Sequence, residues 1–171
     1  VGDWSRDGKS VAFAVRKGDA QGIYVRNPDG VNEFHVTDTP DYAPIWSPDS
    51  RRIAFLSTRD GNPEIYVMDA DGTGQIRMTK SDADEYDVSW SPDGKTLLFV
   101  SNREGNPEIF IVDLEDRKQT RLTHNHTRDD QPVWSPDGKR IAFVSYLDGD
   151  GEIIVMDSKG ENQSRITNND D

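Results

Sequence analysis

The chain of 171 residues contains no cysteine, no long apolar run and little positive charge. Without cysteine it can form no disulfide, use no thiol in catalysis and ligate no zinc through sulfur. No segment reaches the ~18 consecutive apolar residues of a membrane-spanning helix, so we expect no membrane insertion. The 32 acidic residues outnumber the 20 lysines and arginines and give a formal net charge of −12. A surface that binds nucleic acid has the opposite sign, so we expect no nucleic-acid partner.

The sequence also lacks the short motifs that mark common catalytic sites. It has no Gly-x-Ser-x-Gly nucleophile turn, no His-Glu-x-x-His zinc pair and no phosphate-binding loop. Carboxylate pairs are frequent, but a chain this acidic produces them by chance, and nothing singles one out as a glycosidase pair. We therefore expect a protein that is not an enzyme and that needs no cofactor.

What the sequence does contain is a fourfold internal repeat. Four tryptophans are spaced by 42, 44 and 44 residues, at Trp4, Trp46, Trp90 and Trp134. An apolar segment follows each of them, at 11–15, 53–56, 97–100 and 141–144. A second apolar segment follows at 23–25, 64–68, 108–112 and 152–156, and a short third one ends at Thr37, Thr79, Thr123 or Thr167. With the segment that ends at tryptophan, each repeat supplies four short strands.

The local chemistry of the repeat explains these strands. In the Ser-Pro-Asp-Gly sequence that follows tryptophan, proline takes the second position of a turn, where its fixed φ is already suitable, and glycine leaves the turn at little steric cost. Residues 53–56 are apolar at every position, whereas a strand with one solvated face alternates. We therefore expect strands that are covered on both sides, in sheets that stack face to face. No segment has a sustained helical period, so we expect very little helix.

A repeat of about 43 residues with four strands is typical of a β-propeller blade. We predict an all-β fold, a single β-propeller array over 1–171 with four blades of four antiparallel strands. The blades are approximately 1–39, 40–83, 84–127 and 128–171. A β-solenoid fits less well because its repeats are usually shorter. The four blades either close into a small ring or form part of a larger propeller, whose exposed terminal blades would favour a homodimer.

The repeat also carries a family resemblance. The string Trp-Ser-Pro-Asp-Gly-Lys, then Asn-Pro-Glu-Ile and finally Arg-Leu-Thr, resembles the TolB-type WD40-like (PD40) β-propeller repeat family, most closely at 46–79 and 90–123. Two repeats depart from it. Arg6 stands where proline is usual, and the segments 17–22 and 148–151 replace the Asn-Pro-Glu loop.

The resemblance implies a non-catalytic docking module of the bacterial periplasm or extracellular surface. Its protein partner would be a Pal-like lipoprotein, bound on one propeller face around the central channel. Related repeats occur in prolyl-oligopeptidase-type and tricorn-type serine peptidases, where a propeller gates substrate access to a catalytic domain. A third alternative is an excised or engineered repeat array with no function beyond folding, since the chain holds a whole number of repeats.

Acidic residues recur five positions before three of the tryptophans, at Asp41, Glu85 and Asp129. Because inner strands line a propeller channel, these carboxylates could ring one channel mouth and receive a basic partner segment or a cation such as calcium. Asp87, Asp130, Tyr42 and Tyr86 lie beside them and complete the candidate partner-binding set. Purely structural interpretations of these residues remain open. The acids would then face water and cap turns, and the tyrosines would pack against the inner strands.

Other polar residues have the right type for a site but a weak pattern. His124 and His126, with Asp129, have the residue types of a metal site, but a chance pair of loop histidines explains them better, and we expect no metal there. Asp69–Thr73 and Asp148–Gly151 resemble calcium loops faintly, and hairpin turns account for both. Arg59 with Glu64, and Arg103 with Glu108, are expected to form cross-hairpin ion pairs that set loop shape. His35 is expected to be structural.

Overall fold

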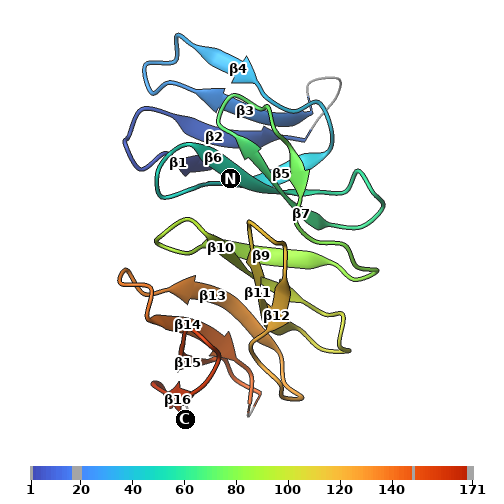
Figure 1. The fold of residues 1–171 in the computed structure, drawn as a ribbon, viewed down its shortest axis with the longest axis vertical. Coiled ribbons are helices and arrows are strands. Elements are labelled where there is room, and N and C mark those ends of the chain that lie inside the picture. The colour runs from blue at the N-terminus through green and yellow to red at the C-terminus, as the bar shows by residue number, and fades with distance from the viewer. Residues whose placement is uncertain (1, 17–20, 148, 169–171) are drawn as a thin grey trace. The chain divides into compact units, whose positions relative to one another are not determined.

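The computed structural model describes residues 2–16, 21–147 and 149–168, and every regular element in them is a β-strand. The strands form four antiparallel sheets of four strands each (Figure 1). The all-β prediction and its four-stranded antiparallel sheets are therefore confirmed. No helix in the described part of the chain is long and apolar enough to span a membrane. The chain divides into two compact units, residues 1–82 and 83–171, which are described in turn.

The first unit contains two sheets. The first sheet consists of β1 (Gly2–Trp4), β2 (Val11–Val15), β3 (Gly22–Arg26) and β4 (Glu33–His35). The second consists of β5 (Asp41–Trp46), β6 (Arg52–Ser57), β7 (Glu64–Asp69) and β8 (Ile76–Arg77). In both, neighbours in sequence are neighbours in space, as expected for strands joined by short turns.

The second unit repeats this arrangement. Its first sheet consists of β9 (Glu85–Trp90), β10 (Thr96–Ser101), β11 (Glu108–Asp113) and β12 (Gln119–Arg121). Its second sheet consists of β13 (Asp129–Trp134), β14 (Arg140–Ser145), β15 (Glu152–Asp157) and β16 (Ser164–Arg165). The same sequence pattern therefore produces the same meander four times.

The turn after each tryptophan is closed by its own side chains. Gly94 N donates to the carbonyl of Ser91 at 2.9 Å, and the Ser91 hydroxyl donates to the Asp93 carboxylate at 2.7 Å. The glycine has a φ of 68°, in the left-handed region that only glycine adopts without strain. In the second repeat Ser50 takes this position with a φ of 58°. The prediction of a Pro-Asp-Gly turn between the first two strands holds, with one residue under strain.

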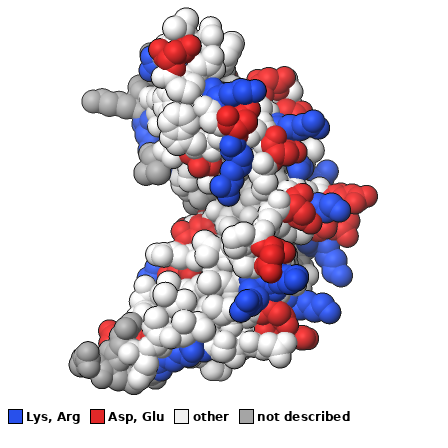
Figure 2. All heavy atoms as spheres, turned by 90° about the vertical axis from the view of Figure 1, so that its left-hand side faces the viewer, with Lys and Arg blue, Asp and Glu red and all other residues white. Residues whose placement is uncertain are grey.

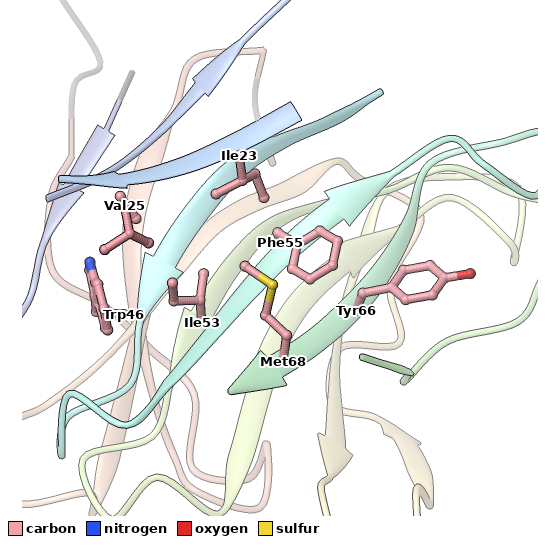
Figure 3. Packing of buried hydrophobic residues seen from close by; sticks show 8 residues of the cluster. Ile23, Val25, Trp46, Ile53, Phe55, Tyr66 and Met68 are labelled. Atoms are coloured by element: carbon pink, nitrogen blue, oxygen red, sulfur yellow. The ribbon is translucent and has the colours of Figure 1, made fainter. Parts of the chain in front are cut away.

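Each sheet has two apolar faces, which we name by their residues. The tryptophan face carries the repeat tryptophan, and in the second sheet it consists of Trp46, Ile53, Phe55, Tyr66 and Met68. The opposite face carries the alternate positions, and in the first sheet it includes Ala12, Ile23 and Val25. In the first unit these two faces pack against each other and form one buried cluster (Figure 3).

The second unit has an equivalent cluster. Leu98, Ile109 and Leu122, from the opposite face of the β9–β12 sheet, pack against the tryptophan face of the β13–β16 sheet. The buried residues on that second sheet are Ile141, Phe143, Ile154 and Met156. Each unit is thus a pair of stacked sheets with a single core, which explains why its central strands are apolar at consecutive positions.

Candidate functional site

The acidic residues singled out in the sequence stand at the start of the first strand of three sheets. Asp41, Glu85 and Asp129 lie opposite Ser57, Ser101 and Ser145 of the neighbouring strand. Each is at most 1% exposed, and Asp130 is equally buried. A partner cannot reach these carboxylates as it would reach an exposed acidic ring. Their role is therefore structural, because a buried charge needs compensating contacts within the protein.

In two sheets the compensating group is an arginine. Arg103 Nη2 lies 2.6 Å from Glu85 Oε1, and its Nε donates to the Ser101 hydroxyl at 2.9 Å. The Nη1 group donates to Gln119 Oε1 at 2.6 Å, and the guanidinium lies 4.8 Å from the centre of the Phe110 ring. One guanidinium thus connects β9, β10 and β12 through charge-assisted hydrogen bonds.

Arg59 makes the same contacts in the second sheet, with Asp41 Oδ2 at 2.7 Å and the Tyr66 ring centre at 4.6 Å. The predicted ion pairs Arg59–Glu64 and Arg103–Glu108 are therefore wrong. Both arginines instead turn back toward the start of the first strand. The reason is the strand register, which places Asp41 directly opposite Ser57, two residues before Arg59.

The glutamates of those predicted pairs belong to a second recurring contact. Arg77, Arg121 and Arg165 each hold the buried Glu64, Glu108 or Glu152 at 2.8–2.9 Å. Beside them Thr79, Thr123 and Thr167 accept a hydrogen bond from the backbone N–H that follows the glutamate, at 2.9 Å each time. This group ties the short outer strand to the strand before it. The first sheet keeps the threonine contact, with Ile23 N donating to Thr37 Oγ1 at 2.9 Å. It lacks the ion pair, since Gly22 and His35 take the glutamate and arginine positions.

His35, at the arginine position of the first sheet, has the structural role that was predicted. Its ring stacks on Tyr24 with centroids 4.3 Å apart, and Nε2 lies 3.1 Å from the carbonyl of Gln21.

The fourth sheet holds its acid without an arginine, because Leu147 occupies the corresponding position. The Ser145 hydroxyl donates to Asp129 Oδ1 at 2.5 Å, and Asn125 Nδ2 donates to Oδ2 at 2.7 Å. Burial raises the pKa of Asp129, although the hydrogen bonds from Ser145 and Asn125 oppose this. Asp129 is therefore the buried carboxylate with the weakest charge compensation of the three.

Near each of these acids, one exposed residue lies at a β-bulge of the first strand. Ala43, Asp87 and Gln131 are exposed, occupy the same position in three repeats and have φ values of 50–53°. The register of the first strand shifts around each of them. Asp87 Oδ2 accepts a hydrogen bond from the backbone of Gln131 at 3.1 Å. Partial burial raises the pKa of Asp87. Sequence reasoning named Asp87 but missed the bulge, because alanine and glutamine carry no signal for a left-handed conformation.

The two tyrosines are half-buried. Tyr86 donates to Asp130 Oδ1 at 3.3 Å, and Arg128 pairs with the other oxygen of Asp130. Burial is the main reason that the pKa of Tyr86 rises to about 12. Tyr42 instead lies under Arg16, whose guanidinium carbon is 4.7 Å from the ring centre. Both tyrosines keep part of the ring accessible, and both sit next to a cation.

A cavity of about 370 Å³ opens beside Tyr42 in the first unit. It is lined by Val15, Arg16, Gln21, Pro40, Asp41, Tyr42 and Thr58. Asp41 Oδ2 is held by Arg59, whereas Oδ1 accepts no hydrogen bond from any described residue. The cavity thus combines a cation, a tyrosine ring and a carboxylate that is itself buried.

The candidate metal ligands are not brought together. His124 and His126 are exposed, whereas Asp129 is buried and bonded to Ser145 and Asn125. Within residues 2–16, 21–147 and 149–168, no three His, Asp or Glu side chains form a group that could hold a metal ion. Asp69–Thr73 is a hairpin turn, in which Gly72 N donates to the carbonyl of Asp69 at 2.9 Å. The segment 148–151 begins at a position outside the described residues.

The family model described as PD40, TolB beta propeller domain, matches the chain twice, at residues 2–89 and 86–171. No curated protein sequence matches this chain significantly. Among solved structures, TolB from Acinetobacter baumannii is 28% identical with a TM-score of 0.78 and covers 97% of this chain. A putative TolB from Agrobacterium tumefaciens is also 28% identical, with a TM-score of 0.81 over 98% of this chain.

The chain spans 42% and 61% of the length of these two structures. A puromycin-hydrolyzing peptidase from Mycobacterium tuberculosis is similar over 96% of this chain and 28% of its own, with a TM-score of 0.76 and 16% identity. At that identity the similarity concerns the fold alone.

Proposed function

The chain belongs to the TolB beta propeller domain family, and on that premise we propose that it is a non-catalytic module that docks a protein partner. The observation that carries the proposal is the likeness to two TolB structures over nearly the whole chain, at 28% identity. A shared fold by itself does not fix function, so the docking surface has to be argued from residues.

We place the docking surface on the second unit, at the first strands of its two sheets, where exposed residues lie beside half-buried ones. The buried Glu85 and Asp129 hold these strands in place. Asp87 offers an exposed carboxylate, and Tyr86 beside it offers an amphipathic ring fixed by Asp130. Tyrosine next to a charge is common at protein interfaces, because the ring gives contact area at low entropic cost. The surface would receive a segment that carries a positive charge.

The first unit offers a separate contact site, the cavity beside Tyr42. The accessible part of the Tyr42 ring and the side chains of Val15 and Pro40 line it and would cover an apolar group of the partner. The cavity is therefore suited to one side chain of the partner.

The partner that the family resemblance implies is a Pal-like lipoprotein, and the corresponding location is the bacterial periplasm or extracellular surface. Both belong to the proposal. The role of a propeller that gates a peptidase is not favoured by any contact, since the peptidase similarity concerns the fold alone. A repeat array without any partner is the outcome that the experiment below must exclude.

Binding of the soluble domain of a peptidoglycan-associated lipoprotein, measured by biolayer interferometry, tests this proposal. The TolB of Acinetobacter baumannii serves as the reference binder. We expect saturable binding, weakened at least tenfold by Asp87→Lys because that change reverses the exposed charge. Glu115→Lys, an exposed change of equal charge in the β11–β12 turn, is the matched control and should bind as the unaltered chain does. No saturation up to about 100 μM, or equal binding by Asp87→Lys, would contradict the proposal.

A further inference from the structure

A second cavity lies inside the second unit, between the turns that follow Trp90 and Trp134. Its volume is about 450 Å³, within the ~300–1,000 Å³ of ligand sites in proteins. The two turns are neighbours, since a Cβ placed on Gly138 would lie 3.9 Å from the ring carbons of Pro92. The lining combines apolar side chains with two carboxylates and includes Pro92, Ile111, Trp134, Pro136, Asp93 and Asp137.

The equivalent tryptophan of the first unit is packed more closely. Trp46 is 7% exposed and belongs to the buried cluster, together with Val25. At the same positions of the second unit, Trp134 and Ile111 are only partly buried. The two units therefore build the same pair of stacked sheets, but the second leaves part of its tryptophan ring uncovered at the turns.

Two side chains that tie the turns together in the first unit are replaced in the second. The Asp3 carboxylate accepts a hydrogen bond from the backbone N–H of Trp46 at 2.7 Å. The Ser50 hydroxyl accepts one from the backbone of the preceding turn at 3.3 Å. Ser89 and Gly138 take the positions of these two acceptors. Glycine has no hydroxyl and serine has no carboxylate, so the sequence of the second unit explains the opening.

The charged residues that line the cavity are both acidic. Asp93 and Asp137 are exposed, and each accepts a hydrogen bond from the serine two positions earlier, at 2.7 and 2.6 Å. These bonds lower the pKa of both carboxyls below the ordinary aspartate value, so both are charged at neutral pH. Lys95 and Lys139 lie near them but do not line the cavity. An occupant that complements this lining has an apolar stem and a positive end.

We propose that this cavity binds one arginine side chain from an extended segment of a protein partner. The guanidinium plane stacks on the accessible part of the Trp134 ring, and its N–H groups donate to Asp93 and Asp137. The methylene groups lie against Pro92 and Ile111. Arginine fits better than lysine because a planar fork can stack and donate to two carboxylates at once. The site does not involve Asp87, so it is independent of the docking proposed above.

Nuclear magnetic resonance of the isotope-labelled chain tests the site through its indole N–H signals. The signals of two tryptophans are assigned by their loss in Trp134→Phe and in Trp46→Phe. The probe is the pentapeptide Gly-Gly-Arg-Gly-Gly, blocked at both ends. The matched probe has citrulline in place of arginine, which keeps the shape and removes the charge. We expect the Trp134 signal to shift with a Kd of about 1 mM and the Trp46 signal to stay in place. The citrulline peptide should bind at least fivefold more weakly.

Charge removal on the protein gives the second arm of the test. The double variant Asp93→Asn, Asp137→Asn keeps an oxygen for each serine bond and should weaken binding of the arginine peptide at least fivefold. Asp49→Asn, the same change at the equivalent turn position of the second sheet, is the matched control and should bind as the unaltered chain does. The absence of a saturable Trp134 shift up to about 20 mM peptide would overturn the proposal. So would equal binding of the citrulline peptide, or equal losses in the double variant and in Asp49→Asn.

Discussion

At the scale of single residues, the turn after tryptophan is strained at one of its four occurrences. Ser50 has a φ of 58°, where Gly8, Gly94 and Gly138 have 68–70°. A side chain in the left-handed region destabilises the folded state by roughly 1 kcal/mol. Glycine avoids this strain, but its greater conformational freedom in the unfolded chain offsets part of the gain. We predict that Ser50→Gly raises the free energy of unfolding by about 0.5–1 kcal/mol, measured by urea denaturation.

The matched control for that prediction is Gly8→Ser. Gly8 has a φ of 70°, and a Cβ placed on it would meet no atom within 4 Å. Strain is then the only change, so the free energy of unfolding should fall by a similar amount. If both substitutions destabilise the protein, the left-handed conformation is not what sets the stability of this turn.

Asp129 gives a residue-scale prediction about pH. Its pKa is raised in the folded protein by burial, so the folded state binds the proton more tightly than the unfolded state does. The stability that Asp129 contributes is present at acid pH and is lost as the pH rises above the ordinary aspartate value of 3.8. Asp129→Asn should therefore lose less stability than the unaltered chain between about pH 4 and pH 7. Urea denaturation at each pH measures the difference, and parallel curves would assign the pH dependence to other groups.

At the scale of elements, Arg103 connects three strands of the third sheet. Arg103→Ala would leave the buried Glu85 without its cation. The free energy of unfolding should fall by about 3 kcal/mol, the low end for a broken buried ion pair, since the arginine is 21% exposed. Arg103→Lys should recover only part of the loss, because an ammonium cannot reproduce the fork that binds Glu85, Ser101 and Gln119. Arg140→Ala, at an exposed position of β14, should cost less than about 0.5 kcal/mol. Equal losses for Ala at 103 and 140 would contradict this role.

The strands themselves could be predicted from the sequence, whereas the contacts of Arg103 could not. Strands and turns follow from local signals: consecutive apolar residues, and Pro-Asp-Gly after each tryptophan. The partner of Arg103 depends on register. Glu108 is nearer in sequence, but the pairing of Ser101 with Glu85 brings Glu85 within reach. The burial of Asp41, Glu85 and Asp129 depends on the same pairing, which composition and spacing do not encode.

At the scale of the whole molecule, a net charge of −12 opposes any contact between two copies. On the face drawn in Figure 2, acidic and basic side chains are intermingled, so no patch of one sign faces the viewer. The proposed docking through Asp87 instead relies on opposite charges, and salt screens such an attraction as the Debye length falls from ~10 Å at 0.1 M to ~3 Å at 1 M.

This screening predicts the salt dependence of docking. Binding of the lipoprotein domain through Asp87 should weaken when sodium chloride increases from about 0.1 to about 1 M, because salt screens the attraction between opposite charges. Interferometry at each salt concentration measures the change. Asp87→Lys, which removes the attraction, should not weaken over the same range. Binding of the unaltered chain that strengthens with salt would instead indicate an apolar contact, and Asp87 would then not be its cause.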